Sequence, residues 1–212
     1  MTSFDLTFLK DKTIHRRVLH LAGSSFVGYY FIPNTLPYGI DRTWVLIIIL
    51  SCVGFLEWYR WFSDRTNTIN HLLRPYEQKR PASYSYFTLG SVILLAFFPQ
   101  FISIPCILST AVCDPLIGFL KHKQSKQLGF NISFFISFIF FFFVWRTSLL
   151  WIAIFASILG SIFVHLAERY STIWLDDDFL MQILPSLLLY IIALLIKMND
   201  SPLPEQIIYA LW

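Results

Sequence analysis

The chain has 212 residues, of which 56% are hydrophobic and only 14% are charged, and its net charge is +3. Its mean hydropathy of +0.61 lies far from the balance of a water-soluble domain, in which about 25% of residues are charged. This composition excludes a soluble globular protein and indicates an integral membrane protein. We expect no nucleic-acid partner.

Seven apolar runs follow one another along the chain. They cover residues 18–33, 44–57, 84–98, 101–120, 130–145, 148–167 and 179–196. A helix needs roughly 17–25 residues to cross about 30 Å of hydrocarbon. The second and third runs are the shortest, so their ends must extend into amphipathic neighbours such as Trp58 and Trp61. We predict an all-α polytopic membrane protein, in which residues 1–212 form a single domain of about seven transmembrane helices.

The basic residues indicate the orientation, because Lys and Arg beside a membrane span are retained in the cytoplasm. If the N-terminus is cytoplasmic, thirteen of the 16 basic residues lie inside, and the outer segments hold only Arg42, Arg146 and Lys197. The inner ones are Lys10, Lys12, Arg16, Arg17, Arg60, Arg65, Arg74, Lys79, Arg80, Lys121, Lys123, Lys126 and Arg169. We therefore predict a cytoplasmic N-terminus, with cytoplasmic segments at residues 1–17, 58–83, 121–129 and 168–178.

Most acidic residues fall at the same ends of the predicted spans. The inner group contains Glu57, Glu77, Asp114, Glu168, Asp176, Asp177 and Asp178, whereas the outer segments hold Asp41, Asp200 and Glu205. A mixture of carboxylates and basic side chains suits a site that holds Mg²⁺ through oxygen ligands and polyphosphate through Arg and Lys.

Asp114 lies inside an apolar run, seven residues before Lys121. At the helical rise, this places the carboxylate roughly 10 Å inside the point where the chain reaches water. A carboxylate there costs about 2.5–3.5 kcal/mol even on lenient scales, so it usually faces a polar cavity. Because Pro115 follows directly, we expect the helix to bend or open at Asp114 and to offer carbonyls to a cation.

Several other motifs allow a structural and a functional interpretation. In "HRRVLH", Arg16 and His20 share a helix face at i, i+4, either as a cytoplasmic anchor with an interfacial histidine or as part of a site. The motif "EWYRW" is either an aromatic belt in which Glu57 pairs with Arg60, or part of that site.

Two acidic motifs before and after residue 170 carry the same ambiguity. His165, Glu168 and Arg169 share a face at i, i+3 and i+4, where a local ion pair is the alternative to a functional role. The acids of "WLDDDFL" could cap a helix, since they precede the last apolar run, but one cap needs only one carboxylate.

Four motifs, in this order, resemble those of the polytopic CTP-dependent lipid kinases: "HRRVLHLAG", "RPYEQKRPASYSYFTLG", "CDPLIGFLKHK" and "AERYSTIWLDDDFLMQILPS". This family includes dolichol kinase, phytol kinase and the CTP-using diacylglycerol kinase of fungi, and it is related to phosphatidate cytidylyltransferase. The resemblance runs from about residue 14 to 190. It implies a Mg²⁺-dependent kinase that transfers the terminal phosphoryl group of CTP to a lipid alcohol, at a cytoplasm-facing site in a bacterial inner membrane or a eukaryotic endomembrane.

The chain departs from the family pattern at three places. The pattern commonly has Gly before the motif aspartate and Asn after the paired aspartates, where this chain has Cys113 and Asp178. The stretch after "DPLIG" is shortened to "KHKQSKQLGFNIS". On this pattern we expect Asp178 to be the most tolerant of the three adjacent acids.

The resemblance assigns roles to residues of the inner segments. The expected catalytic residues are Asp114, His20 and Glu77; the expected metal ligands are Asp114, Asp176, Asp177 and Glu168; and the expected nucleotide-binding residues are Arg16, Arg80, Lys121, Lys123 and Asp177. Three alternatives stay open: a cytidylyltransferase that forms a CDP-lipid, a membrane transporter and a catalytically silent scaffold. The sequence leaves the lipid alcohol and the oligomeric state open.

The charge asymmetry generates a topological prediction. Single cysteines introduced near Gln78, Lys123 and Ser171 should react with an impermeant thiol reagent added to the cytoplasmic side, and one near Pro202 only from outside. Labelling at Lys123 and Pro202 from the same side would rule out an odd number of spans.

Overall fold

A computed structural model describes residues 12–62, 77–78, 80–123, 126–170 and 176–210. The helices of the membrane region are α1 (Lys12–Ala22), α2 (Thr43–Phe62), α4 (Ser83–Phe97), α5 (Gln100–Lys123), α6 (Lys126–Trp145), α7 (Leu150–Arg169) and α8 (Asp177–Met198). Between α1 and α2 lie the 3₁₀ helix η2 (Gly23–Phe31) and a short hairpin, in which β1 (Thr35–Leu36) pairs with β2 (Ile40–Asp41) around η3 (Pro37–Gly39).

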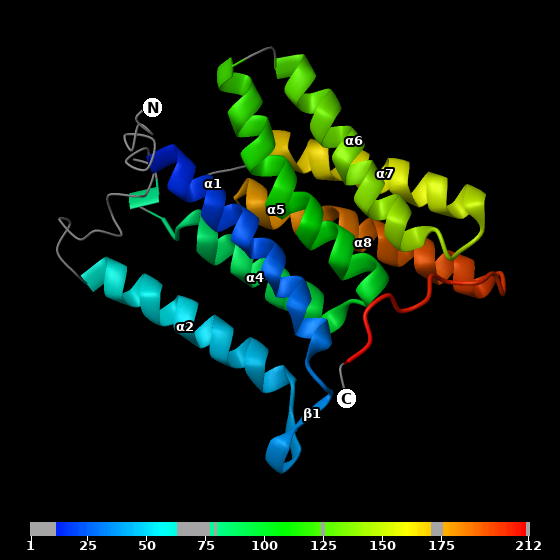
Figure 1. The fold of residues 1–212 in the computed structure, drawn as a ribbon, viewed down its shortest axis with the longest axis horizontal. Coiled ribbons are helices and arrows are strands. Elements are labelled where there is room, and N and C mark those ends of the chain that lie inside the picture. Colours follow the sequence, from blue (N-terminus) through cyan, green and yellow to red (C-terminus); the bar gives the residue numbers. More distant parts are fainter. Residues whose placement is uncertain (1–11, 63–76, 79, 124–125, 171–175, 211–212) are drawn as a thin grey trace, which may run out of the picture.

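Consecutive helices run in opposite directions, as the ribbon shows (Figure 1). One end of the bundle therefore gathers the starts of α4, α6 and α8 with the ends of α2, α5 and α7. The hairpin and the C-terminal segment lie toward the other end. Segments far apart in sequence, notably the starts of α4 and α8, thus meet in one region.

The expected all-α membrane architecture is confirmed, but the count of seven spans is not. By length and composition, five described helices could cross a membrane: α2, α5, α6, α7 and α8. Helix α4 is apolar but has only 15 residues. The first predicted span consists of two unlike pieces, α1 and the 3₁₀ helix η2. The number of spans and the side of the N-terminus stay predictions.

Helix α5 is the centre of the bundle, and it contains two prolines, Pro105 and Pro115. The helix continues through both, so the expected opening at Asp114 is wrong. A proline removes the amide that would bond the carbonyl four residues earlier. At Pro105 this carbonyl is that of Phe101, and it accepts a hydrogen bond from the Trp145 indole Nε1 at 2.9 Å. Packing against α6 therefore replaces a hydrogen bond that the sequence cannot make within the helix.

A buried histidine links α6 to α7. The two ring nitrogens of His165 lie 2.7 Å from the Ser133 hydroxyl and 2.8 Å from the Ser161 carbonyl. Its ring also packs edge-on against Phe130, over which the guanidinium of Arg169 lies. These contacts give His165 a structural role inside the bundle.

Helices α4 and α8 run side by side in the same direction (Figure 1) and share a row of polar contacts. The Ser83 hydroxyl donates to the Asp178 carboxylate. One turn further along both helices, the Gln182 amide donates to the Phe87 carbonyl at 3.1 Å and its oxygen accepts from Ser91 at 3.2 Å. Because these partners repeat every four residues, they fix the register of α8 against α4.

Gly23 allows α1 and η2 to pack closely on α4. A Cβ atom at this position would lie 2.5 Å from the Phe87 ring. The same ring packs edge-on against His20, with 6.0 Å between the ring centroids. Gly23 and Phe87 together therefore hold the last turn of α1 where His20 faces the interior.

The contact between Trp145 and the Phe101 carbonyl leads to a stability prediction. Trp145→Phe should lower the free energy of unfolding by about 1 kcal/mol, because it leaves a buried carbonyl without a donor. In a Pro105→Ala background the loss should be smaller, since that substitution supplies an amide to the same carbonyl. Unfolding in micelles measures both, with Trp151→Phe on the exposed face of α7 as the control. Equal losses in the two backgrounds would contradict the proposed replacement.

Candidate functional site

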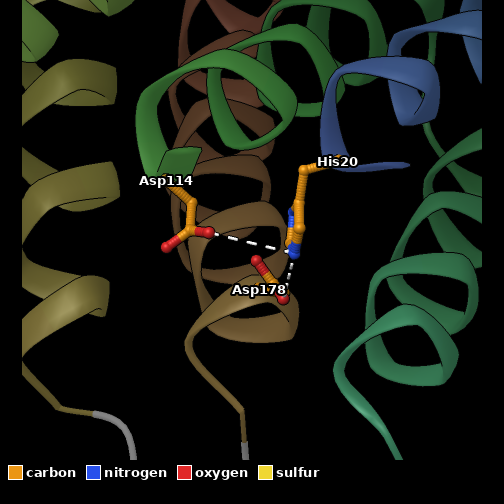
Figure 2. A group of neighbouring side chains, drawn as sticks. All are labelled: His20, Asp114 and Asp178. Carbon is orange, nitrogen blue, oxygen red and sulfur yellow. Dashed lines mark ion pairs between the residues drawn. The ribbon is translucent and has the colours of Figure 1, made fainter. Parts of the chain in front are cut away.

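Three ionisable side chains from three helices converge toward the end of the bundle at which α4 and α8 begin. Figure 2 shows His20 from α1, Asp114 from α5 and Asp178 from α8 pointing toward one another. The His20 Nε2 atom lies 3.6 Å from an Asp178 oxygen and 3.9 Å from an Asp114 oxygen. One ligand atom from each residue lies within 4.8 Å of the others, which is a spacing that a single metal ion could bridge. We call these three residues the central cluster.

Burial distinguishes the members of the central cluster. The Asp178 side chain is fully buried, His20 is 8% exposed, and Asp114 is half-buried. Asp178 lies in the first turn of α8, where the helix dipole favours a negative charge by about 0.3–1 kcal/mol. This gain is small beside the cost of burying an isolated carboxylate. The cluster therefore needs further compensating contacts.

A second group of carboxylates overlaps the first at Asp178. Asp176, Asp177 and Asp178 also bring one ligand atom each within 4.8 Å of one another. Asp176 occupies the N-cap position of α8, but its side chain makes no capping hydrogen bond. Its Oδ2 atom accepts a 2.7 Å hydrogen bond from the guanidinium of Arg80 instead. Capping alone therefore does not account for this acidic triplet.

Two opposing effects act on the protonation of Asp176. Burial and the neighbouring Asp177 carboxylate raise its pKa to about 8, although Arg80 acts in the opposite direction. Because metal ligands must be deprotonated, this raised pKa means that Asp176 binds a cation more strongly as the pH rises.

Several buried polar atoms of this region have no hydrogen-bond partner among the described residues. They are the second carboxylate oxygens of Asp176 and Asp178 and the Nδ1 atom of His20. Buried polar atoms in proteins are almost always paired, and each exception needs an explanation. A cation bound by the carboxylate oxygens would satisfy two of the three atoms. The donor set of oxygens with one imidazole suits Mg²⁺ or Mn²⁺.

The segment before α4 supplies two groups that contact these acids. Arg80 pairs with Asp176 and lies 5.9 Å from the centre of the Tyr86 ring. Ser83, at the start of α4, bonds the Asp178 carboxylate. The predicted nucleotide-binding residue Arg80 is thus located beside the predicted metal ligand Asp176.

The remaining expected site residues lie outside the two carboxylate groups or outside the described part of the structure. Glu77 is buried three residues before Arg80, and Glu168 is half-buried near the end of α7; neither belongs to the two carboxylate groups among the described residues. The side chains of Arg16, Lys121 and Lys123 lie outside the described part of the structure.

The neighbouring Arg17 is described. Its guanidinium donates to the Gly118 carbonyl at 3.4 Å and lies over the Phe119 ring, which joins α1 to α5.

Asp178 has a more central place in the structure than the family pattern indicates. The pattern predicts that Asp178 is the most tolerant of the three acids, which stays a prediction, and the structure places it in both carboxylate groups. Helical periodicity is the signal for this placement, because Asp178, Gln182, Ser186 and Leu189 lie on the buried face of α8 while Asp177 lies beside it.

No family model, curated protein or solved structure matches this chain. The resemblance to CTP-dependent lipid kinases therefore rests on the four sequence motifs alone.

The cluster geometry predicts how the three acids rank as cation ligands. Asp178→Asn should weaken Mn²⁺ binding by more than about 10- to 100-fold, which is the usual cost of losing a group that merely hydrogen-bonds a metal ligand. Asp177→Asn should weaken binding less, because Asp177 belongs to one group only. Electron paramagnetic resonance of free Mn²⁺ measures the affinity, with Asp200→Asn beyond the other end of α8 as the control. Equal tolerance of Asp178→Asn and Asp200→Asn would remove Asp178 from the site.

Proposed function

We propose that this protein is a membrane-embedded phosphotransferase that moves the terminal phosphoryl group of a nucleotide, CTP on the motif resemblance, onto the hydroxyl of a lipid alcohol. The observation that carries the proposal is the central cluster, in which a buried oxygen of Asp178 has no hydrogen-bond partner among the described residues. Two residues before Asp178, the carboxylate of Asp176 binds the guanidinium of Arg80. Phosphoryl transfer requires mainly positioning and charge neutralisation, for which this set of side chains is suited.

The carboxylates of Asp114, Asp176 and Asp178 would hold the cation. A divalent cation bound there would neutralise charge on the phosphoryl oxygens of the nucleotide. Asp178 belongs to both groups, so it would tie the central cluster to the acidic triplet at the start of α8. Asp177, which is half-buried, is the member of the triplet most accessible to nucleotide.

Arg80 would bind the phosphates. A guanidinium binds phosphate oxygens in a bidentate manner and stays charged at any physiological pH. Arg80 is paired with the Asp176 carboxylate. If a cation bound that carboxylate, the Arg80 guanidinium would be released to bind a nearby phosphate. Cation binding would in this way favour nucleotide binding.

His20 and Asp114 would position the acceptor hydroxyl. The His20 Nε2 atom faces both Asp114 and Asp178, so the ring can accept the hydroxyl proton. As the new O–P bond forms, the bond between the γ-phosphorus and its bridging oxygen breaks and the nucleoside diphosphate leaves. Asp114 is half-buried and lies at the border of the cluster. These placements support the roles that the motif resemblance assigns to both residues.

The surroundings of His20 favour a lipid acceptor. His20 faces the interior, while its neighbours Val18, Leu19 and Leu21 are exposed on the outer face of the same helix. In a bilayer these side chains contact acyl chains. A hydroxyl on an apolar tail can therefore approach the cluster without leaving the membrane. The cytoplasmic orientation indicated by the basic residues would let the nucleotide reach the cluster from the cytoplasm.

The transport alternative gains no support from the buried hydroxyls. Within the described bundle, Thr110, Ser137, Ser157 and Ser161 each donate to a carbonyl of their own helix at 2.6–3.0 Å. Such hydroxyls act as small packing residues and do not line a polar path across the membrane.

Isotopic labelling tests the proposed reaction. Purified protein in lipid, incubated with Mg²⁺ and a panel of lipid alcohols, should transfer label from γ-labelled CTP to lipid and none from α-labelled CTP. Asp114→Asn should reduce the transfer by orders of magnitude, whereas Asp200→Asn should not. Label from α-labelled CTP in the lipid would establish a cytidylyltransferase instead. Absence of transfer from CTP and ATP to every acceptor would contradict the proposal.

A further inference from the structure

Glu57 and Arg60 form an ion pair at the inner end of α2. The guanidinium donates from Nε at 2.8 Å and from Nη2 at 2.6 Å to one Glu57 oxygen, as the spacing of "EWYRW" allowed. Arg60 is only 5% exposed, although its neighbours Trp58 and Trp61 on the same helix are more than half exposed. A buried arginine on so exposed a helix needs a structural reason.

The reason lies in the segment that leads into α4. Arg60 donates from Nη1 to the Glu77 carbonyl at 3.1 Å and from Nη2 to the Arg80 carbonyl at 2.8 Å. The other Glu57 oxygen accepts from the Ala82 amide at 2.9 Å and from the Ser85 hydroxyl at 2.7 Å. One ion pair thus binds three backbone groups and one side chain along residues 77–85.

These backbone contacts fix the residues that approach the acids. Arg80, whose carbonyl Arg60 holds, points its guanidinium at Asp176 at a distance of 2.7 Å. Ser83 follows the clamped Ala82 amide and donates to Asp178. In the described contacts, the Glu57–Arg60 ion pair touches none of the carboxylates of the site. Any effect of this ion pair on the carboxylates must therefore act through the residues that it holds between Glu77 and Ser85.

We infer that Glu57 and Arg60 are positioning residues that set the affinity of the acidic site for a divalent cation. This inference rests on the cation site of the proposed function. The described residues from Glu77 to Ala82, which are 77–78 and 80–82, form no α-helix. Irregular backbone at the edge of a membrane requires partners for its polar groups. A planar guanidinium can serve a carboxylate and two carbonyls at once, whereas the Lys ammonium is a point charge with three donors. Arg60→Lys is therefore not a conservative change here.

Cation binding tests the inference without any nucleotide. Mn²⁺ titration of the full-length protein in lipid nanodiscs, followed by electron paramagnetic resonance, should show about 10-fold weaker binding for Arg60→Lys. The matched control is Arg42→Lys at the other end of α2, where Arg42 also donates to a backbone carbonyl, that of Ile32 at 3.4 Å. This control should leave Mn²⁺ affinity unchanged. Wild-type affinity in Arg60→Lys, or no Mn²⁺ binding by the wild-type protein, would overturn the inference.

A charge exchange separates positioning from simple ion pairing. The double variant Glu57→Arg with Arg60→Glu keeps an ion pair at i, i+3 but places donors opposite the Ala82 amide and acceptors opposite two carbonyls. It should not recover Mn²⁺ affinity; recovery would overturn the inference.

Ser85→Ala removes one contact of Glu57 and should weaken Mn²⁺ binding to a smaller degree. This variant replaces the Arg60 variants as the test if those do not fold. Unchanged affinity in Ser85→Ala would then count against the positioning role.

The same titration distinguishes this inference from the proposed reaction. A wild-type protein that binds Mn²⁺ but transfers no phosphoryl group would contradict the kinase proposal alone. The effect of Arg60→Lys on cation affinity would still stand in that case.

Discussion

Burial of the Asp178 carboxylate in an apolar bundle is the constraint around which the end of the bundle containing the start of α8 is arranged. An ionised carboxylate without partners in such surroundings is costly, and the cost falls only where hydrogen bonds or an opposite charge are supplied. The structure supplies the Ser83 hydroxyl, the helix N-terminus of α8 and the imidazole of His20. One oxygen still has no partner among the described residues, and this deficit is what favours a cation.

The contacts that meet this constraint extend well beyond the cluster. Gln182 fixes α8 against α4 one turn after Asp178, so that Ser83 lies opposite the carboxylate. Gly23 lets α1 approach Phe87 closely enough for His20 to face the same place. Helix–helix packing through small residues and interhelical hydrogen bonds is how membrane bundles usually obtain such precision, because lipid offers no hydrophobic driving force between helices.

The sequence could predict the parts of this arrangement that depend on composition and local spacing. Apolar runs located the long helices to within a few residues, and the depth of Asp114 and the spacing of Glu57 and Arg60 marked two features that the structure displays. Helical periodicity could place Asp178 on the buried face of α8. Its match with Ser83 depends on the register of two helices whose paired residues lie 95 positions apart, and local spacing does not encode that register. At Pro105 in α5, the donor to the Phe101 carbonyl comes from Trp145, 40 residues further along the chain, which local spacing does not reveal.

Helix α2 has a consequence for how this protein would respond to its bilayer. Its two buried residues, Leu46 and Arg60, lie near opposite ends, 14 residues and about 21 Å apart, and the helix between them is largely bare. A transmembrane helix that is attached near both ends and otherwise contacts acyl chains can respond to a change in hydrocarbon thickness by tilting. Because the inner attachment is the one that holds the backbone of residues 77–85, such a tilt is transmitted as strain to Arg80 and Ser83. Lipid composition would thereby influence the geometry of the acidic cluster.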